Sequence, residues 1–269
     1  MSDDLFRFDG RVAIITGSGG ALGRAMAIGL TKAGAALGLD DLDEGRLQGT
    51  VSAVRALGGQ CVAMRGDAAD LAHIEAFVAE VERTLGPVDA LVNNAGINPQ
   101  QGAPEDFPMD VWEEVMRVNV GGYIRFAQVV ARRMIAAGRG GSIVNVSSIA
   151  GTSALGRGNL AFGVSKAGVD QMTRELAVAW ASHGIRVNSI IPCQFVNEGL
   201  IGVMADPSKA GNVARMMAGI PMGRMGRPEE IVGPVLFLLS DAASMVTGVN
   251  LPVDGGNLAM NPGGSLPTP

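Results

Sequence analysis

The chain has 269 residues, a formal net charge of −5, and 47% hydrophobic against 17% charged residues. The mild charge and the scattered basic residues argue against nucleic acid or an anionic membrane surface as a partner. No apolar run approaches the roughly 20 residues of a membrane span, and the acidic start lacks the features of a secretory signal. The two cysteines lie far apart, so we expect neither a disulfide nor a metal site. We expect a cytoplasmic protein.

Short β-rich runs alternate with longer helical patterns along the chain. The expected strands are 11–16, 37–40, 60–65, 90–93, 141–146, 185–190 and 246–253. The expected helices cover 21–33, 43–57, 74–84, two stretches within 105–137, 161–182 and 228–239, and residues 192–221 are expected to be irregular. This alternation predicts an α/β protein with a single Rossmann-type, doubly wound parallel sheet flanked by helices on both faces. We expect one domain over residues 1–260 and an extended C-terminal tail over 261–269.

A glycine-rich turn joins the first expected strand to the first expected helix. It reads T-G-S-G-G-A-L-G over residues 16–23. Glycines let the backbone approach a pyrophosphate, whose charge the helix N-terminus stabilises. The turn therefore predicts dinucleotide binding, with Gly17, Gly19, Leu22 and Gly23 as candidate contacts.

Two aspartates, Asp40 and Asp41, end the second expected strand. A carboxylate there can accept hydrogen bonds from the adenosine ribose hydroxyls and repels a 2′-phosphate. The pair therefore favours NAD, with NADP less favoured. Helix capping is the alternative, because Asp43 follows and aspartates are common before helices.

Further motifs follow in an order that resembles the short-chain dehydrogenase/reductase family over nearly the whole chain. They are G-D-A at 66–68, N-N-A-G at 93–96, V-N-V at 118–120, N-V-S-S at 145–148, Lys166 and D-G-G at 254–256. The family pattern for the first turn is T-G-x-x-x-G-x-G, and Ala21 replaces its middle glycine. We therefore expect a local adjustment of the turn and some loss of affinity for the dinucleotide. The same resemblance assigns the ribose contact to Asp41, with Asp40 as a near alternative.

The resemblance also implies roles for individual residues. Asp67 would border the adenine, and the implied cofactor contacts that accompany it are Ala68, Asn94, Ala95 and Gly96. Asn119 would hold a relay water, Ser148 would bind the substrate oxygen, and Lys166 would grip the nicotinamide ribose. The implied activity is hydride transfer between a nicotinamide cofactor and a secondary alcohol or ketone. A polar strand end and a solvated helix lysine are the plain alternatives for Ser148 and Lys166.

Phe162 stands where the family has its catalytic tyrosine, four residues before Lys166. Phenylalanine has no proton to give, and Tyr123 is the only tyrosine in the chain. Three interpretations remain open: an engineered Tyr→Phe form of a dehydrogenase, a natural member that uses another proton donor, or a cofactor-binding protein without turnover. Tyr123 lies four residues after Asn119 on one helical face, a position typical of a core aromatic.

The segment after the sixth expected strand departs from the family pattern P-G-x-x-x-T. Pro192 and Val196 fit this pattern, whereas Cys193 replaces the glycine and Asn197 replaces the threonine. Asparagine keeps a donor and an acceptor, so a contact with the nicotinamide carboxamide is still expected at Asn197. The family is usually dimeric or tetrameric, and we expect a homo-oligomer. The sequence leaves both an apolar and a sugar-like substrate open.

Overall fold

Seven parallel strands form one sheet in the order β3-β2-β1-β4-β5-β6-β7 in the computed structural model, which describes residues 3–99 and 102–260. The strands are β1 (Val12–Thr16), β2 (Ala36–Asp41), β3 (Cys61–Arg65), β4 (Val88–Asn93), β5 (Gly141–Val146), β6 (Ile185–Pro192) and β7 (Asn250–Val253). The strand order reverses direction between β1 and β4. In such sheets, ligands bind beyond the carboxyl ends of the strands at this reversal.

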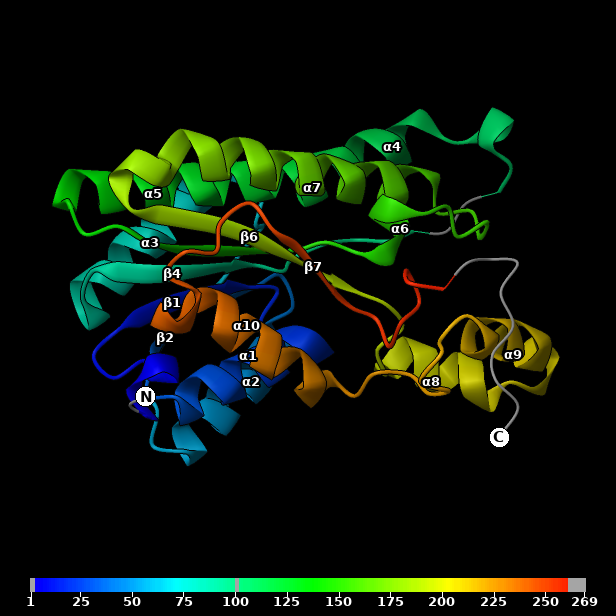
Figure 1. Ribbon diagram of the computed structural model, residues 1–269, viewed down its shortest axis with the longest axis horizontal. Coiled ribbons are helices and arrows are strands. Elements are labelled where there is room, and N and C mark those ends of the chain that lie inside the picture. The colour runs from blue at the N-terminus through cyan, green and yellow to red at the C-terminus, as the bar shows by residue number, and fades with distance from the viewer. Residues whose placement is uncertain (1–2, 100–101, 261–269) are drawn as a thin grey trace.

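Helices cover both faces of the sheet (Figure 1). The helices are α1 (Ala21–Lys32), α2 (Glu44–Ala56), α3 (Leu71–Leu85), α4 (Met109–Met116), α5 (Tyr123–Ala137), α6 (Ile149–Thr152), α7 (Leu160–Trp180), α8 (Glu198–Ala205), α9 (Ala210–Ala218) and α10 (Val232–Leu239). α1, α2 and α10 lie on one face, whereas α3, α5 and α7 lie on the other. The predicted fold class is confirmed.

The sheet is apolar on both sides, because each face packs against helices. All five residues of β1 are buried. One core joins the sheet to α1, α2 and α10, and Ile15 and Leu39 belong to it. A second core joins the opposite face to α3, α5 and α7, and Ile14 and Phe77 belong to it. Alternate residues of a strand thus enter opposite cores, which fixes the register of the strand ends that carry the site.

The expectation that residues 192–221 are irregular is wrong, because α8 and α9 form there. Asn197 begins α8 by accepting a hydrogen bond from the backbone N–H of Leu200 at 2.9 Å. The two helices pack through a small separate cluster of Met216, Ile220 and Met225. Scattered glycines and methionines concealed the helical period, since the tertiary cluster rather than local propensity stabilises these short helices.

Several boundaries also differ from expectation. The last strand is shorter than expected and begins at Asn250, and β6 extends through Pro192. The expected tail over 261–269 lies outside the described residues. No helix within residues 3–99 and 102–260 is long and apolar enough to cross a membrane.

Candidate active site

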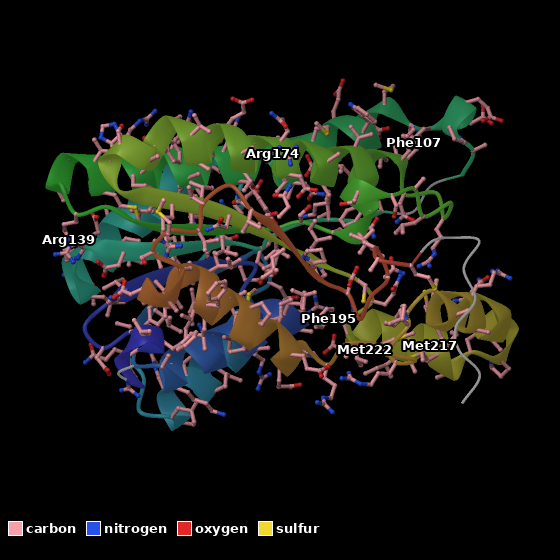
Figure 2. The ribbon with its side chains drawn as sticks, viewed as in Figure 1. Phe107, Arg139, Arg174, Phe195, Met217 and Met222 are labelled. Carbon is pink, nitrogen blue, oxygen red and sulfur yellow. The ribbon has the colours of Figure 1, made fainter. Side chains whose placement is uncertain are left out.

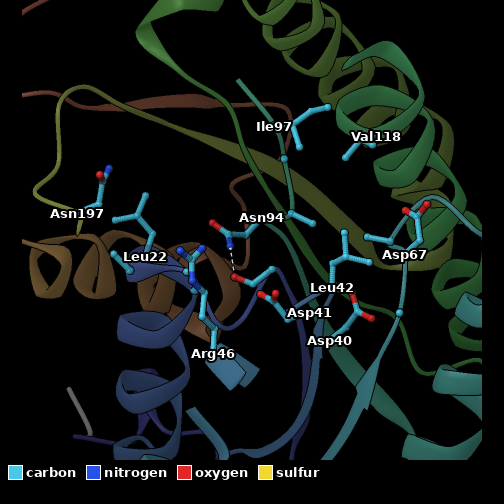
Figure 3. Close-up of a pocket in the computed structure, with 18 of the residues that line it drawn as sticks. Leu22, Asp40, Asp41, Leu42, Arg46, Asp67, Asn94, Ile97, Val118 and Asn197 are labelled. Carbon is cyan, nitrogen blue, oxygen red and sulfur yellow. Dashed lines mark hydrogen bonds between the residues drawn. The ribbon is translucent and has the colours of Figure 1, made fainter. Parts of the chain in front are cut away.

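A cavity of about 450 Å³ opens at the carboxyl ends of the central strands (Figure 3). Its walls come from the glycine-rich turn, the end of β2, residues 66–68, the loop after β4 and the segment after β6. The predicted cofactor residues that line it are Gly17, Leu22, Gly23, Asp40, Asp41, Asp67, Ala68, Asn94, Ala95, Gly96, Val196 and Asn197. Residues far apart in the sequence therefore meet at the reversal of the strand order.

The glycine-rich turn has no room for side chains. Gly17 has φ +61°, and a Cβ placed on it would lie 2.8 Å from the Cα of Ala95. A Cβ on Gly23 would lie 2.2 Å from the carbonyl oxygen of Gly17. Gly19 does not line the cavity, because it packs beneath Arg46. The turn thus brings backbone, rather than side chains, to the cavity floor.

Ala21 needs no special backbone conformation. It is the first residue of α1, and no described non-glycine residue has a positive φ. The helix begins at Gly20 without a side-chain cap, which leaves its first N–H groups available to an anion. The expected local adjustment at Ala21 is therefore absent from the backbone angles, and this N-terminus suits a pyrophosphate.

Asn94 fastens the end of β4 to the glycine-rich turn. Its Nδ2 donates to the carbonyl oxygens of Thr16 and Gly17, at 3.0 and 2.9 Å. The Oγ1 of Thr16 accepts from the backbone N–H groups of Asn94 and Ala95. Six neighbouring polar groups are thereby satisfied, so these hydrogen bonds hold the turn rigidly.

The two aspartates that end β2 have different environments. Asp41 is partly exposed, and its Oδ2 accepts from the backbone N–H of Gly19 at 2.8 Å. Asp40 is fully buried, and its Oδ1 lies 2.6 Å from Nε2 of His73 on α3. This hydrogen bond raises the pKa of His73 above its ordinary value. Asp41 is therefore the better placed of the two to meet a ligand.

Asp67 also lines the cavity, on the side away from Leu22 and Asn197 (Figure 3). An ion pair joins it to Nη1 of Arg117 at 2.8 Å, and Glu114 holds the same guanidinium. Gly66, just before Asp67, packs against the ring of His73, and a Cβ there would lie about 2 Å from that ring. The buried Asp40–His73 pair therefore supports the backbone of the predicted adenine wall.

Asn119 lies behind the cavity rather than in its wall. It is fully buried in a π-helical segment, Arg117–Gly122, that joins α4 to α5. Its side chain exchanges two hydrogen bonds with the backbone of Ile97 and donates to Oγ of Ser165 at 3.0 Å. Asn119 thus ties the loop after β4 to α7, and such π-segments occur often at functional sites.

A second cavity of about 390 Å³ adjoins the first and holds four further predicted residues. Ser148, Phe162, Lys166 and Pro192 line it. The two cavities share wall residues, namely Leu22, Asn94, Gly96, Cys193 and Asn197. A single extended ligand can therefore occupy both.

Ser148 and Phe162 reach this second cavity from neighbouring elements. Ser148 follows β5 and is the N-cap of α6. Its Oγ accepts a hydrogen bond from the backbone N–H of Ala150 at 3.1 Å. Phe162 lies in the first turn of α7, with its ring centroid 5.7 Å from Nζ of Lys166. The hydroxyl of Ser148 keeps its own hydrogen available for a substrate oxygen.

Lys166 is not the solvated helix lysine of the plain alternative, because only 4% of it is exposed. Its Nζ donates to the carbonyl oxygen of Val146 at 2.7 Å and to Oη of Tyr123 at 3.2 Å. Burial lowers the pKa of Lys166 to about 7. The amine thus titrates near neutral pH at the edge of the cavity.

The segment after β6 has its own local structure. Asn197 caps α8, while the backbone N–H of Val196 donates to the carbonyl of Gly226 at 2.9 Å. Cys193 is partly buried, and burial raises the pKa of its thiol to about 11. Cys193 therefore remains a thiol at neutral pH and is not activated as a nucleophile.

The sequence interpretation missed three contacts: the Asp40–His73 pair, the hydroxyl of Tyr123 on Lys166, and the place of Arg46 in the cavity wall. The first two contacts join residues more than 30 positions apart, so no local sequence pattern predicts them. The spacing of Tyr123 after Asn119 was the one available signal, and it indicated only a core position. Tyr123 is indeed in the core, with 2% of its surface exposed.

The fold and the connected cavities define a Rossmann-type α/β protein with a cradle that fits a dinucleotide. Residues 17–257 match the family described as enoyl-(acyl carrier protein) reductase. A crystal structure of a short-chain type dehydrogenase/reductase from Mycobacterium marinum superposes with a TM-score of 0.87 at 32% identity, covering 96% of this chain and 99% of that one. The chain belongs to the short-chain dehydrogenase/reductase family, and its scaffold is that of an enzyme.

Two further relatives carry more specific names. The L-rhamnose 1-dehydrogenase (NAD(P)(+)) of Sphingomonas sp. (strain SKA58) is 40% identical over 251 residues, which cover 92% of this chain and 96% of the relative. A gluconate 5-dehydrogenase from Burkholderia cenocepacia J2315, solved with NADP and tartrate, is 35% identical with a TM-score of 0.87. That match covers 96% of this chain and 99% of the other.

Proposed function

We propose that this protein is an NAD-preferring oxidoreductase that interconverts a secondary alcohol and its ketone on a polyhydroxylated substrate. The observation that carries the proposal is the continuity of the two cavities. A glycine cradle and a ribose-side carboxylate line the first, and Ser148 and Lys166 line the second. A dinucleotide held in the first cavity can extend its nicotinamide into the second.

Each part of the chain has a distinct task in this proposal. The turn around Gly17 and Gly23 holds the pyrophosphate, and Asp41 holds the adenosine ribose. The nicotinamide, when bound, supplies the hydride chemistry. Ser148 orients the substrate oxygen, and Asn119 fixes the loop after β4, whose Gly96 lines both cavities.

Phe162 is proposed to occupy the tyrosine position of the family. Its ring lines the cavity between Ser148 and Lys166, where a phenol would meet the substrate oxygen. General acid–base catalysis contributes about 10²–10⁴-fold in rate, so the loss of that hydroxyl slows turnover without removing cofactor binding. The second candidate function, cofactor binding without turnover, rests on this missing hydroxyl alone. The accessible hydroxyl of Ser148 and the buried amine of Lys166 favour a working reaction.

The preference for NAD rests on charge at the ribose. Asp41 repels a 2′-phosphate, while Arg46 lines the same cavity and pairs with Glu198 of α8 at 3.4 Å. Because this exposed pair is weak, Arg46 can turn toward a phosphate when Asp41 is absent. The expected selectivity is therefore moderate and depends on Asp41.

The second cavity favours a substrate that is both hydroxylated and anionic. Its described wall holds four amide side chains, Asn94, Asn98, Asn159 and Gln194, besides that of Asn197, and no carboxylate. Arg157 lines the same wall. Neutral sugars and sugar acids are the named substrates of the two relatives above. The arginine leads us to propose a sugar acid for this chain.

A small apolar cluster adjoins the two cavities through Cys193, which lines both of them. Met217 and Met222 lie beside α8 and α9 at the same end of the molecule (Figure 2). Met217 packs on the separate cluster that holds these helices together. We propose that this part of the chain covers the substrate, as mobile lids do in many enzymes.

The test combines cofactor titration with a matched substrate pair. NADH and NADPH binding is measured by fluorescence, and oxidation of D-gluconate is compared with that of D-glucitol, which lacks the carboxylate. The comparison is made in the Phe162→Tyr background, and Arg157→Gln is expected to lower kcat/KM for gluconate about tenfold while sparing glucitol. Failure to bind either nucleotide contradicts the proposed function, and equal loss for both substrates contradicts the role of Arg157.

A further inference from the structure

Tyr123, the only tyrosine of the chain, is hydrogen-bonded to the one buried lysine of the described residues. Its Oη donates to the carbonyl oxygen of Val146 at 3.1 Å and accepts from Nζ of Lys166 at 3.2 Å. The ammonium group also lies over the tyrosine ring, 4.8 Å from its centroid. Two acceptors and an aromatic face thus hold the head of Lys166.

Among the described residues, no carboxylate forms a hydrogen bond or ion pair with Nζ of Lys166. Asp170, one turn later on α7, directs its Oδ1 to Oγ of Ser189 at 3.3 Å and only modestly favours the ammonium form. Cys193 and Arg157 are the other titratable side chains of the cavity wall. Burial dominates and lowers the pKa of Lys166 to about 7, whereas burial raises the pKa of Tyr123, which remains a neutral phenol.

We propose that Lys166 is itself the acid–base group of this protein and that Tyr123 is the residue that positions it. The inference rests on the proposed oxidoreductase function. Tyr123 does not line the cavity and is almost fully buried, so it acts through Lys166 and not on the substrate. The amine thus has a phenol partner in the buried Tyr123, whereas Phe162 at the cavity wall offers none.

The proton and the electrons balance in the following step. In alcohol oxidation, the O–H and carbinol C–H bonds break and a C=O bond forms. The neutral Nζ takes the hydroxyl proton, and the hydride would go to an oxidised nicotinamide when one is bound. The new ammonium is stabilised by Val146 and Tyr123, and then loses its proton to solvent through the cavity. Ketone reduction runs through the same groups in reverse.

The first measurement is the titration of Lys166 in the protein without cofactor. Uniform labelling with [¹³Cε]lysine gives only three signals, because the chain has Lys32, Lys166 and Lys209 alone. Lys32 and Lys209 are exposed and serve as internal controls. The expected midpoint for Lys166 is near 7, and a midpoint near those of the controls overturns the proposal.

The second measurement isolates Tyr123. Tyr123→Phe keeps the ring and removes one acceptor from the ammonium, so the midpoint of Lys166 is expected to fall by about one pH unit. The pH profile of kcat should move by the same amount. A lower melting temperature with an unchanged midpoint would show a purely structural role and overturn the proposal.

Fluorotyrosine incorporation covers the case in which Tyr123→Phe does not fold. Because the chain has one tyrosine, 3-fluorotyrosine labels position 123 alone. The ¹⁹F resonance is expected to shift with the same midpoint as Lys166, and a resonance that does not respond there contradicts the contact. Neither titration needs cofactor or turnover, so both separate this inference from the proposed function. Loss of NADH binding would contradict only the latter.

Discussion

The two connected cavities differ in what determines their geometry. In the first cavity, here called the cofactor cavity, the backbone determines the geometry. Gly17 has a positive φ, Gly23 has no room for a Cβ, and Asn94 fastens the end of β4 to the glycine-rich turn. In the second cavity, here called the reaction cavity, side chains determine the geometry, and under the proposed function the oxygen missing at Phe162 would change the chemistry. A backbone-built site persists as long as the fold persists, whereas a side-chain site can change its reaction with a single substitution.

Gly23→Ala should break the cofactor cavity and is expected to give the largest effect. The new Cβ would lie 2.2 Å from the carbonyl oxygen of Gly17, so the turn must open. We expect NADH affinity to fall by on the order of 100-fold or more, because the cradle loses its close approach to the pyrophosphate. Gly20→Ala is the matched control, with ordinary φ and 3.5 Å to its nearest neighbour. Equal losses in both variants would show that space in the turn is not the determinant.

Asp41→Ser should show that one side chain does matter in the cofactor cavity. Removal of the carboxylate ends its repulsion of a 2′-phosphate and frees Arg46 to bind that group. We expect the ratio of NADH to NADPH affinity to fall by about tenfold or more, since one lost charge contact at a partly exposed site is worth about 1.4 kcal/mol. Asp70→Ser, at the exposed cap of α3 and outside the cavity wall, should leave the ratio unchanged. An unchanged ratio in Asp41→Ser would show that another residue determines the preference between NADH and NADPH.

The Asp40–His73 pair gives a smaller, pH-dependent effect. Its hydrogen bond raises the pKa of His73 above 6.5, so the protonated histidine stabilises the folded state. This contribution is fully present below pH 6.5 and is lost as the pH rises through the folded pKa. We expect the free energy of unfolding to fall in that window, and His73→Gln to abolish the dependence. His183→Gln, which changes the only other histidine, should retain it in denaturant titrations.

The sequence predicts the sheet well because its strands are short, apolar and regularly spaced between amphipathic helices. It also predicts the cofactor cavity, because glycines such as Gly17 indicate a tight backbone turn, and this turn forms the floor of the cavity. It fails at α8 and α9, whose stability comes from a small tertiary cluster around Met216. It also fails at the contact between Tyr123 and Lys166, because packing of α5 against α7 creates that contact and neither helix encodes it alone.

The measurement that most directly tests the separation of the two cavities is a comparison of this protein with its Phe162→Tyr variant. NADH dissociation constants and steady-state kcat are determined for both under identical conditions. We predict dissociation constants within about twofold and a higher kcat in the tyrosine form, by less than the roughly 10²–10⁴-fold of a complete general acid–base contribution because Lys166 is proposed to supply part of it. Tight NADH binding with no turnover by either form, or equal turnover by both, would contradict the account.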